Sequence, residues 1–353
     1  MHQVTLIDMS SHPYSVAGLF AGIGGIETGF SLAGFAPVIA NELDPYASET
    51  YRENYAHALV EGDIAEFDAA LLPDDLTVLA GGFPCQPFSV AGYRKGFNDD
   101  RGNVYWEIER LFKATKPDVV FLENVKNLVG HDGGNTFRVI KSSLEDAGYF
   151  VTAEVLNSKT HGNVPQNRER IYIIAFKSEV SFRAYSWPTE VPLTTKLSAL
   201  IDFNRKVDDK YYYTSERPFY SDLVASITKK NTIYQWRRRY VRENMSGVSP
   251  TLTANMGMGG HNVPLILSKH GIRKLTPQEC FRLMGFDDLR TPAGMSESRL
   301  YKQAGNAVVV PVVQRIAVEI RRALDVSMLD AIGEETSMQE ALAPRVKEPI
   351  PTQ

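Results

Sequence analysis

Short apolar runs alternate with amphipathic segments over the first half of the chain. The apolar runs predict strands, and they cover 15–20, 38–40, 76–80, 119–122, 150–156 and 171–176. Between them, apolar residues at helical spacing predict helices over 26–33, around 46–51, and over 105–115 and 137–147. This alternation predicts an α/β fold, a doubly wound and mostly parallel sheet covered by helices on both faces.

The alternation stops near Trp187. Residues 188–272 carry scattered aromatic side chains without a clean period, and we expect a second, smaller and irregular domain there. Thr276 with Pro277 and Glu279 forms the pattern of a capping box and predicts a helix start. Residues 308–324 predict the last helix. The acidic stretch 325–353 predicts a flexible tail.

The composition is that of a globular protein. The 353 residues are 43% hydrophobic and 23% charged, with a net charge of -4. There is no apolar run of membrane-spanning length and no secretory leader, so we expect a cytoplasmic protein without a membrane segment. Cys85 and Cys280 are the only cysteines, which argues against a disulfide scaffold, and without a histidine cluster they do not indicate a metal site.

A glycine-rich turn follows the first strand and opens a helix. It reads Phe20-Ala21-Gly22-Ile23-Gly24-Gly25, and such a turn is either a tight structural turn or the cradle of a nucleotide-like cofactor. Glu42 ends the next strand, where an acid can accept both hydroxyls of a ribose, and Asp63 could accept an exocyclic amine. Two acids favour S-adenosylmethionine over NADP and leave NAD open.

One thiol follows a buried strand directly. Gly81 and Gly82 predict a turn after that strand, and Pro84 and Pro87 stiffen the segment around Cys85. Cys85 is therefore either a small buried side chain or a reactive thiol at a strand end. Glu123 ends another strand, and it is either a solvated strand end or an acid that faces the same crevice.

Two basic segments come later. Arg168 and Arg170 flank Glu169, so on an extended segment both arginines share a face, as part of a surface ion-pair ladder or as contacts to an anion or base. A basic patch follows, which is either a solvated face or a surface for phosphates, because Tyr234, Trp236 and Tyr240 are interleaved with the cations. The cations of this patch are Lys229, Lys230, Arg237, Arg238, Arg239 and Arg242.

These segments together resemble the DNA (cytosine-5) methyltransferases of bacterial restriction-modification systems. The resemblance covers about 15–324 and rests on blocks in the order of that family. The blocks are Phe20 to Gly25, Asn41 to Asp44, Gly62 to Ile64, Gly82 to Ser89, Glu123 to Val125, Gln166 to Arg170, Arg273 to Phe286, and Gln303 to Val308.

The resemblance implies a Rossmann-like fold, S-adenosylmethionine as cofactor, S-adenosylhomocysteine as product, and a covalent mechanism. Cys85 would add to carbon 6 of a cytosine, and Glu123 would neutralise nitrogen 3. Arg168 would contact the carbonyl of the base, while Arg170 would support the thiol and its loop. The cofactor would be bound by Phe20, Ala21, Gly22, Gly24, Gly25, Glu42, Asp63, Ile64, Pro84, Asn306 and Val308.

The resemblance also implies duplex DNA as partner, with the target base flipped out of the helix. Residues 88–102 would form a loop that closes on the DNA, with Ser89 near a phosphate. The expected DNA contacts are Gln86, Ser89, Arg94, Arg237, Arg238, Arg239, Arg242, Thr251, Gly259 and Gly260. We expect a monomer, and a cognate restriction endonuclease as a further partner.

The expected division of the chain follows from these assignments. It comprises a catalytic and cofactor-binding domain (1–187), a target-recognition domain (188–272), a connecting segment (273–301), a return to the catalytic domain (302–324) and the acidic tail (325–353).

Three other functions fit parts of the sequence. An RNA methyltransferase of related sequence has little chain between the arginine block and the next block, whereas 177–272 is long and basic here. A nicotinamide dehydrogenase would use the glycine turn and Glu42 but has no need of Cys85 and Glu123. A non-catalytic DNA-binding relative would not need Cys85, Glu123 and Arg168 together.

Overall fold

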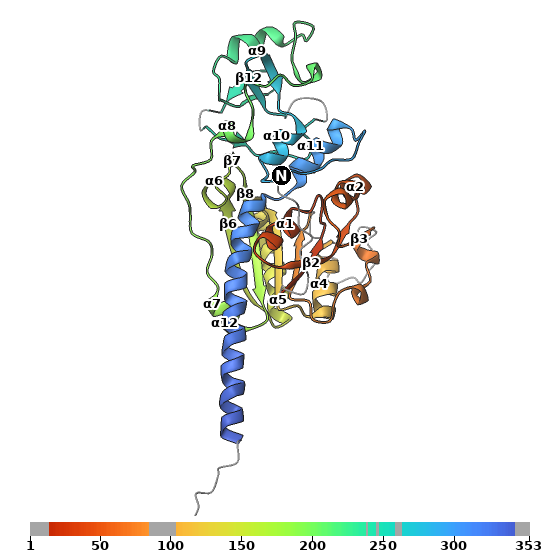
Figure 1. Ribbon diagram of the computed structural model, residues 1–353, viewed down its shortest axis with the longest axis vertical. Coiled ribbons are helices and arrows are strands. Elements are labelled where there is room, and N and C mark those ends of the chain that lie inside the picture. The colour runs from red at the N-terminus through yellow and green to blue at the C-terminus, as the bar shows by residue number, and fades with distance from the viewer. Residues whose placement is uncertain (1–13, 85–103, 238, 245–246, 258–262, 343–353) are drawn as a thin grey trace, which may run out of the picture.

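The computed structural model describes residues 14–84, 104–237, 239–244, 247–257 and 263–342, with side chains up to residue 331. Figure 1 shows a large sheet with helices around it, a smaller sheet at one end of the molecule, and a long helix that runs down one side. The order of elements alternates between strands and helices up to β8, which confirms the predicted α/β fold.

The large sheet has seven strands in the order β3-β2-β1-β4-β5-β8-β6. Its strands are β1 (Ser15–Leu19), β2 (Ala36–Glu42), β3 (Ala58–Glu61), β4 (Val78–Gly82), β5 (Val119–Val125), β6 (Phe150–Asn157) and β8 (Glu169–Phe176). The first five are parallel, whereas β8 runs antiparallel to both β5 and β6. The segment between β6 and β8 is too short for a covered crossover, so the chain turns back at the same end of the sheet.

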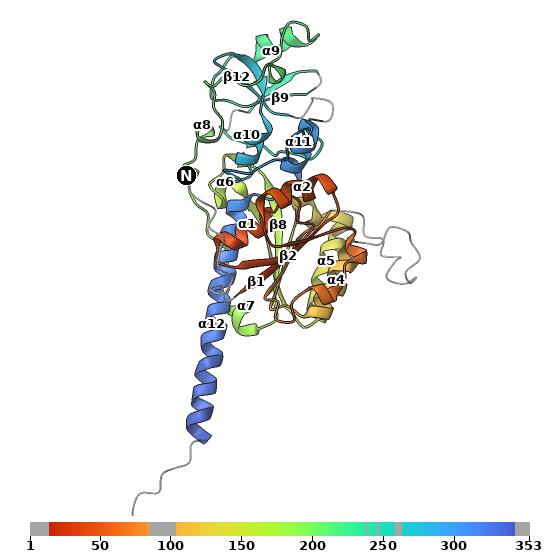
Figure 2. The ribbon, with the colours of Figure 1, turned by 45° about the vertical axis from the view of Figure 1, so that its right-hand side comes forward.

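Apolar side chains alternate between the two faces of the sheet. On β5, Val119 and Phe121 join the core cluster that contains Phe30 of α1, while Val120 and Leu122 join the cluster that contains Ile108 of α4. Figure 2 shows α1 and α12 on one side of the sheet and α4 and α5 on the other. The helices of this part are α1 (Gly25–Leu32), α2 (Pro45–Asn54), α4 (Val104–Thr115), α5 (Asn135–Asp146), α6 (Ser158–His161) and α7 (Glu179–Ala184).

The smaller sheet has its own core. Its strands lie in the order β10-β9-β12-β13 and are antiparallel, and Trp236, Leu265 and Leu223 pack together beside them. The elements of this region are α8 (Leu197–Leu200), α9 (Tyr220–Ser226), β9 (Tyr234–Trp236), β10 (Val241–Glu243), β12 (Leu265–Ser268) and β13 (Gly271–Lys274). A short parallel pair, β7 (Gln166–Asn167) with β11 (Ser249–Pro250), ties this region to the chain just before Arg168.

The C-terminal region returns to the large sheet. It consists of α10 (Pro277–Arg282), α11 (Glu297–Asn306) and α12 (Val310–Leu342). The capping box predicted at Thr276 is present, since the Thr276 side chain accepts from the Glu279 N–H and the Glu279 side chain accepts from the Thr276 N–H.

The last helix is longer than predicted. Its first turns are buried against the sheet through Val313, Ile316 and Ile320, but the helix continues beyond Leu324 to Leu342. The prediction that the last helix ends at Leu324 is therefore wrong, whereas the flexibility of 325–342 stays a prediction. Residues 325–342 contain no proline that would stop the helix. Residues 343–353 of the predicted tail lie outside the described residues.

None of the helices in the described ranges is long and apolar enough to cross a membrane. Within the same ranges, no group of three histidine, cysteine, aspartate or glutamate side chains could hold a metal ion.

Candidate active site and cofactor site

The turn between β1 and α1 has an unusual backbone. Phe20, Gly22 and Gly24 have φ angles of 56°, 58° and 83°, in the left-handed region that glycine adopts easily and other residues rarely do. A Cβ atom at Gly22 would meet no other atom within 4 Å, so one side of the turn is open. The strained Phe20 and the open glycine suit a turn that is shaped for a ligand.

Side chains from distant segments hold this turn in place. The Tyr55 hydroxyl lies 3.0 Å from the Gly24 carbonyl oxygen and 2.7 Å from the Thr28 hydroxyl. A Cβ at Gly25 would lie 2.8 Å from Val308 Cγ2 and 3.3 Å from the Phe286 ring. Val308 was predicted at this site, whereas Tyr55 and Phe286 were not, because only the fold brings them to the turn.

Glu42 lies beside the turn, at the end of β2. One of its carboxylate oxygens accepts the Gly22 N–H at 2.7 Å and the other accepts the Asp44 N–H at 2.7 Å. Burial raises the pKa of Glu42, and these two hydrogen bonds oppose that change. Each oxygen keeps a free lone pair, so the carboxylate is fixed in place and can still accept hydroxyl groups.

Asp63 follows the neighbouring strand β3. Its side chain accepts the Ala65 N–H at 3.0 Å and so caps the short turn that begins at Ile64. A Cβ at Gly62 would meet nothing within 4 Å, and Leu43, next to Glu42, is 62% exposed. Leu43 thus presents an apolar side chain to solvent directly after Glu42 in the sequence.

These residues fit an adenosine-bearing cofactor. Open space lies over Gly22 and Gly62, with Glu42 and Asp63 at the ends of adjacent parallel strands. Among the other residues predicted for the cofactor, Asn306 and Pro84 are exposed, while Ile64 is 4% exposed.

The second part of the site lies where β4 and β5 end. Gly81 and Gly82 continue β4 as strand residues paired with Leu122 and Glu123, so the predicted turn at these glycines is wrong. Gly82 instead leaves room for the Glu123 carboxylate, because a Cβ at position 82 would lie 3.3 Å from Glu123 Oε2. Asn124 Nδ2 donates to the Phe83 carbonyl oxygen at 2.9 Å and joins the two strand ends.

Part of the predicted site lies outside the described residues. This is the case for Cys85, Gln86, Ser89, Arg94, Arg238, Gly259 and Gly260. Strand β4 and Phe83-Pro84 lead directly to Cys85, so the described chain ends one residue before the predicted nucleophile.

Glu123 is buried at the end of β5 and is 8% exposed. Burial raises its pKa, and the nearby charges of Arg170 and Arg168 lower it in part. Arg170 Nε lies 3.1 Å from Glu123 Oε1. Position 170 pairs with Val125 across β5 and β8, which places the guanidinium beside the carboxylate.

The role predicted for Arg168 does not agree with the structure. Arg168 was expected to contact the carbonyl of a bound base, but it is 3% exposed and donates to backbone carbonyls. Its Nη1 donates to Leu252 O at 2.8 Å, and its Nη2 donates to Ala307 O at 2.8 Å and to Gly305 O at 3.2 Å. Arg168 precedes β8 and is enclosed by loops of the smaller domain and the C-terminal region, whereas Arg170, on the strand, reaches Glu123.

The basic patch of the smaller domain differs from its prediction in part. Arg237, Arg239 and Arg242 are exposed, as a surface for phosphates requires. Tyr234 and Trp236 are 0% and 7% exposed and belong to the core of the small sheet, so they are not interleaved at the surface, although Tyr240 is 59% exposed. Lys229 is paired with Glu243 at 2.8 Å. Thr251 donates to the Asn167 carbonyl oxygen at 2.6 Å.

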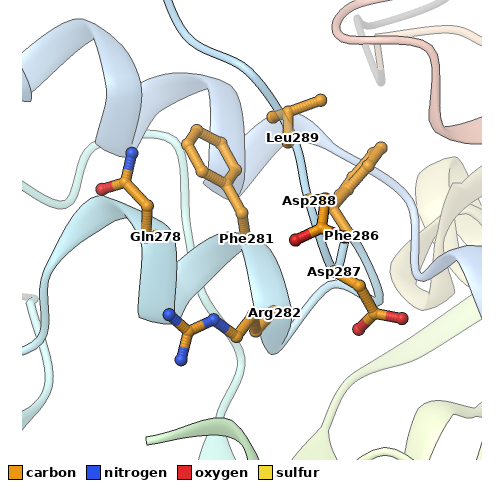
Figure 3. Close-up of a pocket in the computed structure, with 7 residues that line it drawn as sticks. All are labelled: Gln278, Phe281, Arg282, Phe286, Asp287, Asp288 and Leu289. Atoms are coloured by element: carbon orange, nitrogen blue, oxygen red, sulfur yellow. The ribbon is translucent and has the colours of Figure 1, made fainter. Parts of the chain in front are cut away.

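A pocket of about 260 Å³ lies beside α10. Figure 3 shows Phe281, Phe286 and Leu289 around it, with Asp287 and Asp288 on the turn that follows the helix. Phe286 is shared with the packing of the glycine turn, but none of the predicted site residues lines this pocket. We therefore assign the pocket no part in the site.

Known proteins resemble this chain along most of its length. The family model for C-5 cytosine-specific DNA methylases matches residues 14–322. The Type II methyltransferase M.Bsp6I of Bacillus sp. (strain RFL6) is 52% identical over 312 residues, which make up 88% of this chain and 99% of that protein. M.HhaI of Haemophilus parahaemolyticus is 36% identical over 319 residues, covering 87% of this chain and 94% of that protein.

Solved structures show the same fold at lower identity. A DNMT2 mutant of Spodoptera frugiperda has a TM-score of 0.66 at 18% identity and covers 87% of this chain and 99% of its own. The methyltransferase EhMeth of Entamoeba histolytica has a TM-score of 0.67 at 17% identity and covers 88% of this chain and 98% of its own. The solved structures show the fold alone, whereas the family match and the sequence identities show the family. The chain belongs to the C-5 cytosine-specific DNA methylases and is a DNA (cytosine-5) methyltransferase.

Proposed function

We propose that the protein methylates carbon 5 of one cytosine in a short duplex DNA sequence through a covalent adduct with Cys85. The observation that carries this proposal is the buried Glu123–Arg170 pair at the end of β5, next to the strand that leads to Cys85. A buried carboxyl group with a raised pKa can share a proton with a ring nitrogen, and the thiol motif follows on the neighbouring strand.

The proposed reaction has three stages, which are addition of Cys85 to the ring, methyl transfer and release of Cys85. The Cys85 thiolate adds to carbon 6, and the electron pair of the double bond moves toward carbon 5, while Glu123 neutralises the charge at nitrogen 3. Carbon 5 would then take the methyl group as the bond from that group to the sulfonium sulfur breaks, and the sulfur would keep the electron pair as S-adenosylhomocysteine leaves. A base would remove the carbon 5 proton, the electron pair of that bond would re-form the 5,6 double bond, and the Cys85–carbon 6 bond would break to release the thiolate.

Arg170 takes the role of base clamp that the sequence suggested for Arg168. Its guanidinium contacts Glu123 and retains donors for the carbonyl oxygen of a cytosine bound beside that acid. Arg168 instead donates hydrogen bonds to the backbone carbonyls of Leu252, Gly305 and Ala307, and so fixes the segments around the site.

S-adenosylmethionine, when bound, supplies the methyl group from its sulfonium centre. Glu42 would accept the ribose hydroxyls, Asp63 and Ile64 would face the base, and Leu43 would give the base an apolar wall. The turn from Phe20 to Gly25, with Pro84, Asn306 and Val308, would surround the rest of the cofactor. Two carboxylates at strand ends leave no place for an additional phosphate, which argues against NADP.

The small domain is proposed to recognise the DNA. We infer the division into a catalytic domain, a target-recognition domain at 188–272 and a returning segment at 302–324, and we place DNA phosphates at Arg237, Arg238, Arg239 and Arg242. The separate core of the small sheet and the exposed arginines support this. The relatives are Type II methyltransferases, so we infer a restriction-modification role in the cytoplasm, as a monomer beside a cognate endonuclease.

Trapping with a modified substrate tests the mechanism. Duplex DNA that carries 5-fluorocytosine at the target should give a stable protein–DNA adduct, because fluorine at carbon 5 cannot leave as a proton. Cys85→Ser should abolish both the adduct and the transfer of a labelled methyl group, whereas Cys280→Ser, which changes a buried cysteine of α10, should retain both. Methyl transfer by the Cys85→Ser protein would rule out Cys85 as nucleophile.

A further inference from the structure

One face of α11 holds the first turn of α2. Arg299 and Gln303 are one helical turn apart, and both contact Tyr46. The guanidinium carbon of Arg299 lies 3.2 Å from the centre of the Tyr46 ring. Gln303 Nε2 donates to the Tyr46 carbonyl oxygen at 2.8 Å, and the Thr50 hydroxyl donates to Gln303 Oε1 at 3.0 Å. Two residues of α11 thus fix the segment that follows Glu42.

Lys302, on the same face, makes the contact nearest to Glu42. Its Nζ lies 2.7 Å from Asp44 Oδ2. The other oxygen of Asp44 accepts the Tyr46 N–H at 3.0 Å and caps α2. The Asp44 N–H in turn donates to Glu42 at 2.7 Å, and Gly22 donates to the second Glu42 oxygen at 2.7 Å. A continuous series of contacts therefore runs from Lys302 to the glycine turn.

The charge on Asp44 agrees with this series. Burial alone would raise the pKa of Asp44, but the hydrogen bond from Lys302 and the N–H of Tyr46 outweigh it, and the pKa is lowered. Asp44 is therefore an anion at neutral pH and forms an ion pair with Lys302. The Lys302 side chain is about half-exposed, and the Asp44 side chain is more buried.

The helix that carries Lys302 is itself anchored elsewhere. Arg168 binds the carbonyls of Gly305 and Ala307 at its end, and a Cβ at Gly305 would lie 2.1 Å from the backbone of Thr253. These contacts make no use of α2. The end of α11 is thus held independently of the segment that Lys302 touches.

We propose that Lys302 is a positioning residue for the cofactor, acting through Asp44 to hold the Glu42 carboxylate where it meets the ribose. The inference rests on the proposed function, in which Glu42 accepts the ribose hydroxyls. Lys302 itself does not touch the cofactor. Because the ion pair is partly exposed, its loss should weaken cofactor binding only about three- to fivefold, and high salt should reduce the difference.

A double-mutant cycle tests this with S-adenosylhomocysteine as the probe. Its Kd is measured by calorimetry without DNA for the wild type, Lys302→Met, Asp44→Asn and the double variant. Each single change should raise Kd about three- to fivefold, and the double variant should be no weaker than the weaker single one. Lys302→Arg should restore binding, and kcat at saturating cofactor should stay at the wild-type value.

Lys113→Met is the matched control. Lys113 forms an ion pair of similar exposure with Glu109 at 2.6 Å on α4, remote from α11, and its loss should leave Kd unchanged. Melting temperatures of all variants check that they are folded. An unchanged Kd for Lys302→Met, additive effects in the cycle, or an equal effect of Lys113→Met would each overturn the proposal.

Glu42→Gln separates this proposal from the one on which it rests. If Glu42→Gln weakens binding strongly and Lys302→Met does not, only the positioning role of Lys302 fails. If Glu42→Gln leaves Kd unchanged, the proposed cofactor site itself is wrong.

Discussion

Replacing Glu27 by glutamine should stabilise the protein at neutral pH. Glu27 lies in the first turn of α1 and is completely buried, and neither carboxylate oxygen has a hydrogen-bond partner among the described residues. It is packed so closely on β1 that a Cβ at Gly18 would lie 1.8 Å from Glu27 Oε1. Burial, with a smaller contribution from Glu42, raises the pKa of Glu27 to about 8.

The sign of the effect follows from proton binding. The ordinary pKa is 4.5, so between about 4.5 and 8 the folded protein keeps a proton that the unfolded chain releases. Stability is therefore lost as pH rises through this window. At pH 7 the loss is about 3 kcal/mol, because each unit of difference corresponds to about 1.4 kcal/mol. Glutamine is neutral in both the folded and the unfolded protein, so Glu27→Gln does not lose stability as pH rises. At pH 4 glutamate and glutamine are both mostly neutral and should give nearly the same stability.

Urea unfolding at a series of pH values measures the effect. The gain in unfolding free energy of Glu27→Gln over wild type should grow from pH 4 to pH 7 by about 3 kcal/mol. Comparison across pH cancels the constant cost of burying an amide. Glu53→Gln, on the exposed surface of α2, is the control and should show no such growth. A constant difference between Glu27→Gln and wild type at every pH would refute the reasoning.

Three other outcomes are expected. Arg170→Met should lower kcat at saturating S-adenosylmethionine about 100-fold or more. Arg168→Met should instead cost about 2–4 kcal/mol of stability, because it leaves buried carbonyls without donors. Kinetics and urea unfolding of both variants decide, and a large loss of kcat for Arg168→Met with none for Arg170→Met would return the base contact to Arg168. Arg273→Met should destabilise by about 3–5 kcal/mol in thermal unfolding, because the buried Glu279 loses both 2.7 Å contacts, and a loss below about 1 kcal/mol would contradict this. Replacing Arg237, Arg238 and Arg239 by alanine should reduce the slope of log K for DNA against log salt by about 3, and an unchanged slope in a salt titration would place the phosphates elsewhere.

Local patterns in the sequence were sufficient for much of the fold and for the positions of the acids. Alternating apolar runs predicted the strands. Glu42 ends β2 as expected, whereas β5 continues two residues beyond Glu123. The capping box at Thr276 was readable because all its contacts lie within one helical turn. These features depend on neighbours that are close in the sequence.

The features that were predicted wrongly or missed depend on distant neighbours. Arg168 and Arg170 are equivalent by spacing, and only the loop at Leu252 and the end of α11 decide which of them is buried. Tyr234 and Trp236 stand among cations in the sequence, but the small sheet turns them inward. Tyr55 and Phe286 reach the glycine turn from other segments of the chain, and no local spacing indicates that contact.

The packing of α12 against α1 has a consequence for how the protein is made. Val313 and Ile316 complete the same core cluster as Ile26 and Phe30, and the Tyr14 hydroxyl donates to Asp325 at 2.9 Å. During synthesis the part of this core that α12 covers therefore stays open until α12 has left the ribosome, even though Phe30 already packs against Phe121 of the sheet. Translation that stops inside the small domain would yield a fragment for proteolysis. Because the two ends of this core meet, a circularly permuted gene that joins them should still encode the same core.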